Sequence, residues 1–121
     1  MGKKILVIDD EPDIVKILVA TLKANQYLVV TAQDGEEGLQ KVVLEEPDLI
    51  IVDVMMPKMD GFTFVKRLKS REDWRSIPVI VLTAKDKMKE LFEVEGVAAY
   101  LVKPFDYDEL VAAVKKHLPW I

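Results

Sequence analysis

Three short apolar runs constrain the fold of this chain more than any other feature of its sequence. They span residues 5–8, 49–52 and 79–82, and none of them contains a polar residue. A strand with one face in water alternates apolar and polar side chains, whereas a strand covered on both faces does not. The three runs therefore predict strands in the middle of a parallel sheet, with helices on both faces.

Two weaker runs and five helical patterns complete an alternating order. Residues 28–32 and 98–102 are less uniformly apolar, which indicates strands nearer the edges of the sheet. Five strand–helix units predict a parallel α/β sheet with right-handed crossovers, in one domain of residues 1–121. The helices are indicated by apolar residues recurring every three or four positions: Ile14, Ile17, Leu18 and Leu22; Leu39, Val42 and Val43; Phe62, Val65 and Leu68; Met88, Leu91 and Phe92; Leu110, Val114 and Leu118.

Helix start signals agree with this order. Pro12 suits the first turn of a helix, where its missing N–H has no partner to lose. Residues 34–37 and 106–109 resemble capping boxes, with aspartate in place of serine or threonine. Asp60 is expected to cap the third helix.

Composition excludes several classes of function. The net charge of −4 argues against non-specific binding to nucleic acid or to an anionic membrane. The absence of cysteine excludes disulfides and thiolate chemistry, and the single histidine leaves little room for a histidine-based metal site. No apolar run reaches the roughly 18 residues of a membrane span, and no signal peptide is visible. We therefore expect a cytoplasmic protein.

Carboxylates follow two of the central strands. Asp9 and Asp10 come directly after the first strand, and Asp53 follows the third. Ligands of doubly wound sheets bind beyond the carboxyl ends of the strands, and these two strands are commonly neighbours, so the three acids should converge. A helix cap would explain Asp9 or Asp10, but not all three. Converging carboxylates without histidine or cysteine suit a hard cation, and Mg²⁺ is the predicted ion.

Polar residues also end the fourth and fifth strands. Thr83 would suit a helix cap and Lys103 a solvated surface charge, but their shared edge favours a site. The three carboxylates and one ammonium leave a charge of −2, which a divalent cation would neutralise. A phosphoryl group would then approach without net repulsion, with Thr83 and Lys103 bonded to its oxygens. Asp53 would be the nucleophile that forms an aspartyl phosphate.

Four stretches of this sequence resemble the receiver domain of bacterial two-component response regulators, including single-domain regulators of the chemotaxis type. They are "ILVIDDEPD", "PDLIIVDVMMPKMDGF", "IPVIVLTA" and "YLVKPFD", in this order. The resemblance implies a flavodoxin-like (βα)5 three-layer sandwich with strand order 2-1-3-4-5. It also implies a cis peptide bond before Pro104.

The resemblance implies roles for the strand-end residues. Asp53 would accept a phosphoryl group from a phosphohistidine of a sensor histidine kinase or histidine phosphotransfer protein. Asp10 and Asp53 would bind Mg²⁺ through their side chains, Met55 through its backbone carbonyl, and Asp9 mainly through a metal-bound water. Thr83 and Lys103 would contact the phosphoryl group.

Tyr100 matches the aromatic switch position of the same family. The implied mechanism moves Thr83 toward the phosphoryl group and lets Tyr100 turn inward, which changes the partner affinity of the fourth helix, fifth strand and fifth helix. The downstream partner is an unidentified protein, and a monomer or a phosphorylation-dependent dimer is expected. The stretch "GVAAY" departs from the acidic pair common in the family, so we expect a fourth helix that is short, shifted or mobile.

Two other functions compete with this reading. A Mg²⁺-dependent phosphohydrolase of the haloacid dehalogenase type would carry a DxDx[TV] motif after the first strand, where this chain has "DDEPD". A receiver that binds partners without phosphorylation would not need the intact acidic cluster, Thr83 and Lys103. We expect a phosphoacceptor that assists its own phosphorylation and dephosphorylation, and not an enzyme acting on a separate substrate.

Overall fold

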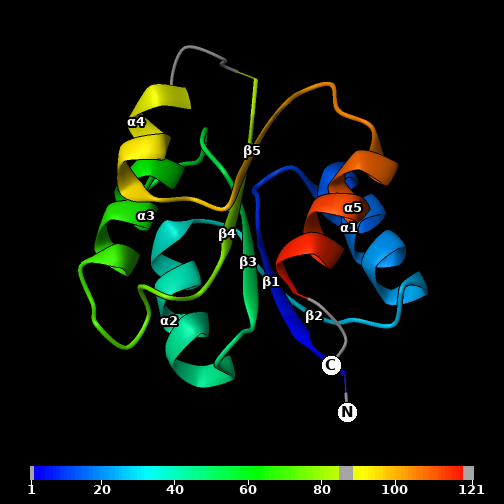
Figure 1. The fold of residues 1–121 in the computed structure, drawn as a ribbon, viewed down its shortest axis with the longest axis horizontal. Coiled ribbons are helices and arrows are strands. Elements are labelled where there is room, and N and C mark those ends of the chain that lie inside the picture. The colour runs from blue at the N-terminus through cyan, green and yellow to red at the C-terminus, as the bar shows by residue number, and fades with distance from the viewer. Residues whose placement is uncertain (1, 85–88, 119–121) are drawn as a thin grey trace.

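A computed structural model of the chain describes residues 2–84 and 89–118, in which five strands and five helices alternate (Figure 1). The strands are β1 (Lys4–Ile8), β2 (Leu28–Ala32), β3 (Leu49–Asp53), β4 (Val79–Thr83) and β5 (Ala99–Val102). The helices are α1 (Pro12–Ala24), α2 (Gly35–Glu45), α3 (Gly61–Lys69), α4 (Lys89–Glu95) and α5 (Tyr107–His117). Met88, in the predicted stripe of the fourth helix, lies outside the described residues.

The sheet is parallel throughout and its strand order is β2-β1-β3-β4-β5. Figure 1 shows α1 and α5 on one face of the sheet and α2, α3 and α4 on the other. This three-layer arrangement is the flavodoxin-like fold, and both the fold class and the strand order are confirmed. Strand order reverses between β1 and β3, which places the ends of those two strands at the ligand-binding edge of such a sheet.

The continuous apolar runs occupy the three central strands, as predicted. Leu6 and Ile8 of β1 face the layer of α2, α3 and α4, while Ile5 and Val7 face α1 and α5. All of these side chains are completely buried. Burying an aliphatic side chain of this size contributes about 1.5–3 kcal/mol, so a charged residue at any of these positions would oppose the fold. The outer strands β2 and β5 keep partly exposed residues, which explains their mixed composition.

The bounds of β2 are as predicted, the other four strands each differ from their predicted bounds by one residue, and two of these differences concern the site. Asp53 and Thr83 are the last residues of β3 and β4 and not the first residues after them. Each polar side chain is therefore positioned by the sheet itself. β5 begins one residue later than predicted, although the Ala98 backbone N–H still donates to Val79 O at 2.8 Å.

Helix caps follow the predicted signals in part. Asp34 accepts from Glu37 N at 2.9 Å, whereas the Glu37 carboxylate accepts from Gln33 N and not from the cap residue itself. Asp60 caps α3 by accepting from Thr63 N at 2.8 Å. Asp106 caps α5 through the nearer amide of residue 108. No helix in the described part of the chain combines the length and the apolar character that a membrane span requires.

The start of α1 excludes the simple capping role for the acid pair. The N-cap residue is Glu11, which is followed by Pro12 and makes no side-chain cap. Asp9 Oδ1 instead accepts from Glu11 N at 2.9 Å, which fixes the turn out of β1. The second oxygen of Asp9, Oδ2, lies 3.6 Å from Lys103 Nζ.

Candidate functional site

The three predicted acids converge at the carboxyl end of the sheet. One carboxylate oxygen from each of Asp9, Asp10 and Asp53 lies within 4.8 Å of the others. Asp9 and Asp53 are each only 2% exposed, whereas Asp10 is exposed to solvent. The cluster is therefore buried on one side and open on the other, as a site for a small ligand requires.

Lys103 reaches into this cluster from the segment after β5. Its Nζ lies 3.3 Å from Asp53 Oδ1 and 3.6 Å from Asp9 Oδ2. Thr83 is completely buried, and its backbone oxygen accepts from Lys103 N. Because Asp53 pairs with Leu82 in the sheet, Thr83 stands one residue beyond the partner of Asp53 on the neighbouring strand. All five strand-end residues thus share one edge.

Glu11 is a member of the cluster that sequence reasoning missed. Its Oε1 lies 3.2 Å from Lys103 Nζ, and its side chain is 57% exposed. Its position directly after Asp9 and Asp10 could have indicated that it belongs to the site. The sequence does not show, however, in which direction the side chain of a glutamate at a helix start points. Glu11 therefore competes with Asp9 and Asp53 for the single ammonium of Lys103.

Burial makes the ionised form of these carboxyls costly. Burial, helped by the Asp9 carboxylate and opposed by Lys103, raises the pKa of the Asp53 carboxyl to about 6. Burial is also the main cause that raises the pKa of Asp9. Burial alone would lower the pKa of Lys103, but the carboxylates of Asp9 and Asp53 outweigh it and raise that pKa. The cluster is short of positive charge.

The donor set fits a magnesium ion. Among the described residues, Asp9 Oδ2 is buried and accepts no hydrogen bond, which leaves an anionic oxygen with unused acceptor capacity. Carboxylate oxygens are the ligands that Mg²⁺ prefers. Met55 lies two residues beyond β3 and is 54% exposed. The contact between its carbonyl oxygen and the ion stays a prediction.

Gly61 brings the start of α3 against the end of β3. Its N–H donates to Val54 O at 2.9 Å. A Cβ at this position would collide with the backbone oxygen of Asp53 and would lie 2.8 Å from Val54 Cα. Only glycine permits this approach, so the "MMPKMDG" loop returns tightly beside the site.

Tyr100 is a half-buried aromatic residue of β5. Its ring centroid lies 5.7 Å from that of Phe92 in α4, and Phe92 in turn lies 5.3 Å from Phe62 in α3. These rings connect the strand next to β4 with two helices of one layer. The contact shows that Tyr100 packs between β5 and α4, and its switch role stays a prediction. The peptide bond before Pro104 is cis, as the resemblance implied.

The family model of the response regulator receiver domain matches residues 5–115. The chain belongs to this family. It is 45% identical over 117 residues to the alkaline phosphatase synthesis transcriptional regulatory protein PhoP of Bacillus subtilis, covering 95% of this chain and 48% of PhoP. The chain thus spans about half the length of that relative.

Two solved structures share the fold over nearly the whole chain. A putative response regulator from Chloroflexus aurantiacus matches with a TM-score of 0.93 and 33% identity, covering 99% of this chain and 100% of the other. The response regulator TrrA from Thermotoga maritima, solved in complex with Mg²⁺-BeF, matches with a TM-score of 0.87 and 35% identity, covering 96% and 99%. Receiver domains of response regulators receive phosphoryl groups from histidine kinases, so membership implies phosphorylation-dependent signalling.

Proposed function

We propose that this receiver domain is a phosphorylation-dependent switch whose phosphoacceptor is Asp53. The observation that carries the proposal is the buried Asp53 carboxylate, 3.3 Å from Lys103 Nζ and grouped with Asp9 and Asp10. The phosphoryl donor is a phosphohistidine of a sensor histidine kinase or of a histidine phosphotransfer protein. The chain itself assists the transfer and the later hydrolysis, without turning over a separate substrate.

The transfer is a displacement at phosphorus. An Asp53 carboxylate oxygen forms the new bond to phosphorus while the bond from phosphorus to the histidine nitrogen breaks, and the electron pair stays on the imidazole. A pKa of about 6 leaves most Asp53 side chains ionised, and therefore nucleophilic, at pH 7. Lys103 and Thr83 bind two of the phosphoryl oxygens and stabilise the charge that develops on them.

Asp9, Asp10 and Asp53 would hold Mg²⁺, together with the Met55 backbone carbonyl. The bound ion would supply positive charge that offsets both the carboxylates and the phosphoryl oxygens. The buried Asp9 Oδ2, which accepts no hydrogen bond from the residues that the structure describes, supports this assignment. Lys103 enters from the segment after β5, and its Nζ, 3.3 Å from Asp53 Oδ1, would be within reach of a phosphoryl group on Asp53.

The output follows from the position of Thr83 beside β5. Bonding of Thr83 to the phosphoryl group draws the end of β4 toward the site, and Tyr100 on the adjacent strand turns inward. The surface of α4, β5 and α5 then changes its affinity for a downstream protein, either in a monomer or through a phosphorylation-dependent dimer. The contact between Tyr100 and Phe92 supports this route, since it joins β5 to α4. A free-energy difference of a few kcal/mol is enough for such a shift.

Phosphorylation by acetyl phosphate tests the assignment of Asp53. Wild-type protein incubated with acetyl phosphate and Mg²⁺ is expected to gain the mass of one phosphoryl group, and EDTA should prevent the gain. Asp53→Asn should gain nothing, whereas Asp73→Asn, at an exposed position after α3, should behave as wild type. Labelling of Asp53→Asn to the wild-type level would contradict the proposal.

A further inference from the structure

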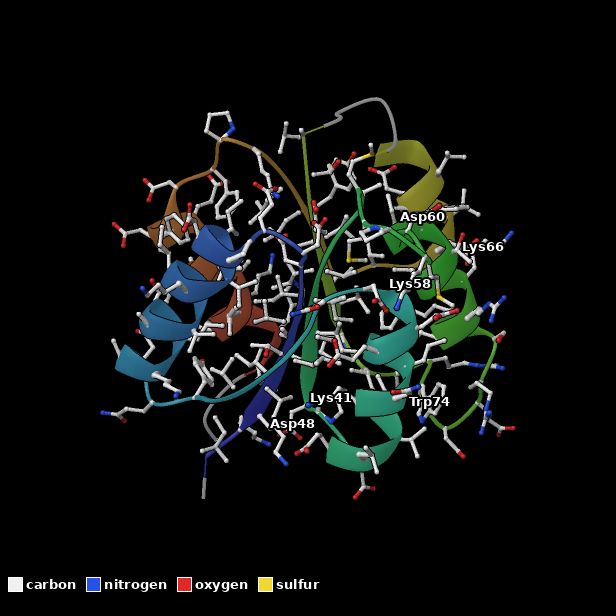
Figure 2. All side chains as sticks on the ribbon, turned by 180° about the vertical axis from the view of Figure 1, so that it is seen from behind. Lys41, Asp48, Lys58, Asp60, Lys66 and Trp74 are labelled. Carbon is white, nitrogen blue, oxygen red and sulfur yellow. The ribbon has the colours of Figure 1, made fainter. Side chains whose placement is uncertain are left out.

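A groove separates α2 from the carboxyl-terminal end of α3, away from the acidic site. It has a volume of about 400 Å³ and is lined mainly by Leu39, Val43, Arg67, Arg71 and Trp74. Figure 2 shows Trp74 beside α2, at the opposite end of α3 from Asp60. The groove therefore lies at the far end of α3 from Asp53.

Three of the residues that line the groove are apolar. Leu39 and Trp74 are partly buried and pack against the core cluster of that layer. Val43, on the rim, is 61% exposed. Single exposed apolar residues are common on soluble proteins, but here exposed Val43 and the partly buried Leu39 and Trp74 line one concave surface. Such a surface suits one apolar side chain of a partner.

Two arginines line the same groove, Arg67 in the last turn of α3 and Arg71 two residues beyond the end of that helix. Among the described residues, no ion pair engages Arg67 or Arg71. The Arg71 guanidinium lies 4.5 Å from the Trp74 ring centroid, a cation–π contact that holds the arginine against one wall of the groove. No carboxylate of the described residues lines this groove, although the net charge of the chain is −4. An adjoining hollow shares Val43, Arg71 and Trp74 with the groove. Glu46 and Asp73 line that hollow, whereas Arg67 lines only the groove.

The wall that carries Trp74 is held by hydrogen bonds. Lys69 Nζ donates to Arg75 O at 3.0 Å and to Ile77 O at 3.4 Å, and burial lowers the pKa of this lysine. Within the same loop, the backbone N–H of Trp74 donates to Arg71 O at 3.0 Å. A groove that is already formed loses little conformational entropy when a ligand binds.

We propose that this groove is a docking site for an acidic segment of a partner protein. The segment would place an apolar side chain on Leu39, Val43 and Trp74. Two of its carboxylates, four residues apart on a helix, would pair with Arg67 and Arg71. The proposal goes beyond the phosphorylation switch, because no residue of the groove belongs to the acidic site. Docking here is therefore independent of Mg²⁺ and of the state of Asp53.

The test uses a fluorescein-labelled helical peptide with a central leucine and glutamates four residues apart, and a matched peptide with glutamines in their place. Fluorescence anisotropy on the full chain should show binding of the acidic peptide and at least about tenfold weaker binding of the glutamine peptide. Arg67→Glu, Arg71→Glu and the milder Arg71→Gln should each weaken binding of the acidic peptide. Lys23→Glu, the same charge change in the last turn of α1, should leave it within about twofold.

The site of binding is checked on the ¹⁵N-labelled chain, where the Trp74 indole N–H resonance should move on addition of the acidic peptide. The proposal is overturned if the acidic peptide shows no binding at concentrations up to about 1 mM. It is also overturned if Lys23→Glu weakens binding as much as Arg71→Glu. Concentration-dependent dimerisation that Arg71→Glu abolishes would assign the groove to a second copy of this chain instead.

Discussion

Two ion-pair clusters lie at opposite ends of β1, and they differ in how deeply their side chains are buried and in whether their charges balance. At the amino end, Lys4 Nζ lies 3.1 Å from Glu45 Oε1, with 31% and 33% of the two side chains exposed. The Lys4 backbone N–H also donates to Asp48 Oδ2 at 2.8 Å, and Figure 2 shows Asp48 at this end of the sheet. This cluster is shallow, and solvent screens its charges.

At the carboxyl end, the side chains of Asp9 and Asp53 are only 1% and 3% exposed, and both lie within 4 Å of the Lys103 ammonium. Two buried carboxylates share one ammonium, with Asp10 beside them and Glu11 drawing on the same charge. A shallow and balanced pair contributes little to stability, about 0–1 kcal/mol. A buried cluster with unbalanced charge opposes folding, and such clusters concentrate at functional sites. The effect on folding stability therefore distinguishes the structural ion pair at the amino end from the functional cluster at the carboxyl end.

The largest expected difference in stability is between two single variants, each of which removes the lysine of one cluster. In the absence of divalent cations, Lys103→Met should lower the free energy of unfolding at pH 7.5 by about 3 kcal/mol, because it leaves buried carboxylates without a counter-ion. Lys4→Met should lower it by less than about 1 kcal/mol. Urea denaturation in EDTA measures both values. Equal losses in the two variants would remove the distinction between the two ends of β1.

Neutralising Asp53 should raise the free energy of unfolding, whereas removing Lys103 should lower it. The pKa of Asp53 is raised to about 6 in the folded chain, so the folded state holds this proton more tightly than the unfolded state does. This contribution to stability is present below about pH 4 and is lost as the pH rises to 6. Asp53→Asn should therefore be about 2–3 kcal/mol more stable than the wild type at pH 7.5 without Mg²⁺. Urea unfolding at pH 4.5 should show a much smaller gain.

The ion pair at the other end of β1 provides a control for the stabilisation expected of Asp53→Asn. Glu45→Gln removes a carboxylate from the shallow pair and should change the free energy of unfolding by less than about 1 kcal/mol at pH 7.5. Stabilisation by Asp53→Asn that did not depend on pH would show that the gain has a cause other than the titration of this carboxyl.

The central strands could be predicted from the sequence because all of the residues in their apolar runs are buried, whichever face of the sheet they are on. A run such as residues 49–52 is apolar throughout, and only burial on both faces accounts for that. The strand-end positions of Asp53, Thr83 and Lys103 then followed from chain direction in a parallel sheet. The strand order came from resemblance, since apolar periodicity does not say which strands pair.

Other features depend on side-chain direction or on packing between distant segments. Glu11 was missed because the rotamer of an exposed glutamate at a helix start is set by its neighbours, here Lys103. The groove was missed because it needs Val43 of α2 beside Trp74, which follows α3. Arg67 and Arg71 are visible in the sequence four residues apart, but the sequence does not say that neither forms an ion pair with the residues that the structure describes.

Magnesium should offset the excess negative charge at the carboxyl end of the sheet, so that this end opposes folding less. An ion bound only by the folded chain stabilises it by about 1.4 kcal/mol at a free concentration ten times its dissociation constant. Adding Mg²⁺ to the wild type should therefore raise the midpoint of thermal unfolding, and EDTA should reverse the rise. Asp53→Asn should respond much less, whereas Glu45→Gln should respond as the wild type. A full response in Asp53→Asn would place the ion elsewhere.

Glu11 provides the smallest and most selective test, because it belongs to the site but is exposed. Glu11→Gln should change the free energy of unfolding by no more than about 0.5 kcal/mol, since its pair with Lys103 is screened by solvent. It also removes a negative charge near Asp9 and Asp10, which should weaken Mg²⁺ binding about twofold to threefold at low salt. Titration of Mg²⁺ followed by NMR shifts of the Asp10 amide measures this change. An unchanged affinity would mean that Glu11 serves only to hold Lys103, and a loss of stability near that of Lys103→Met would mean that the pair is not screened at all.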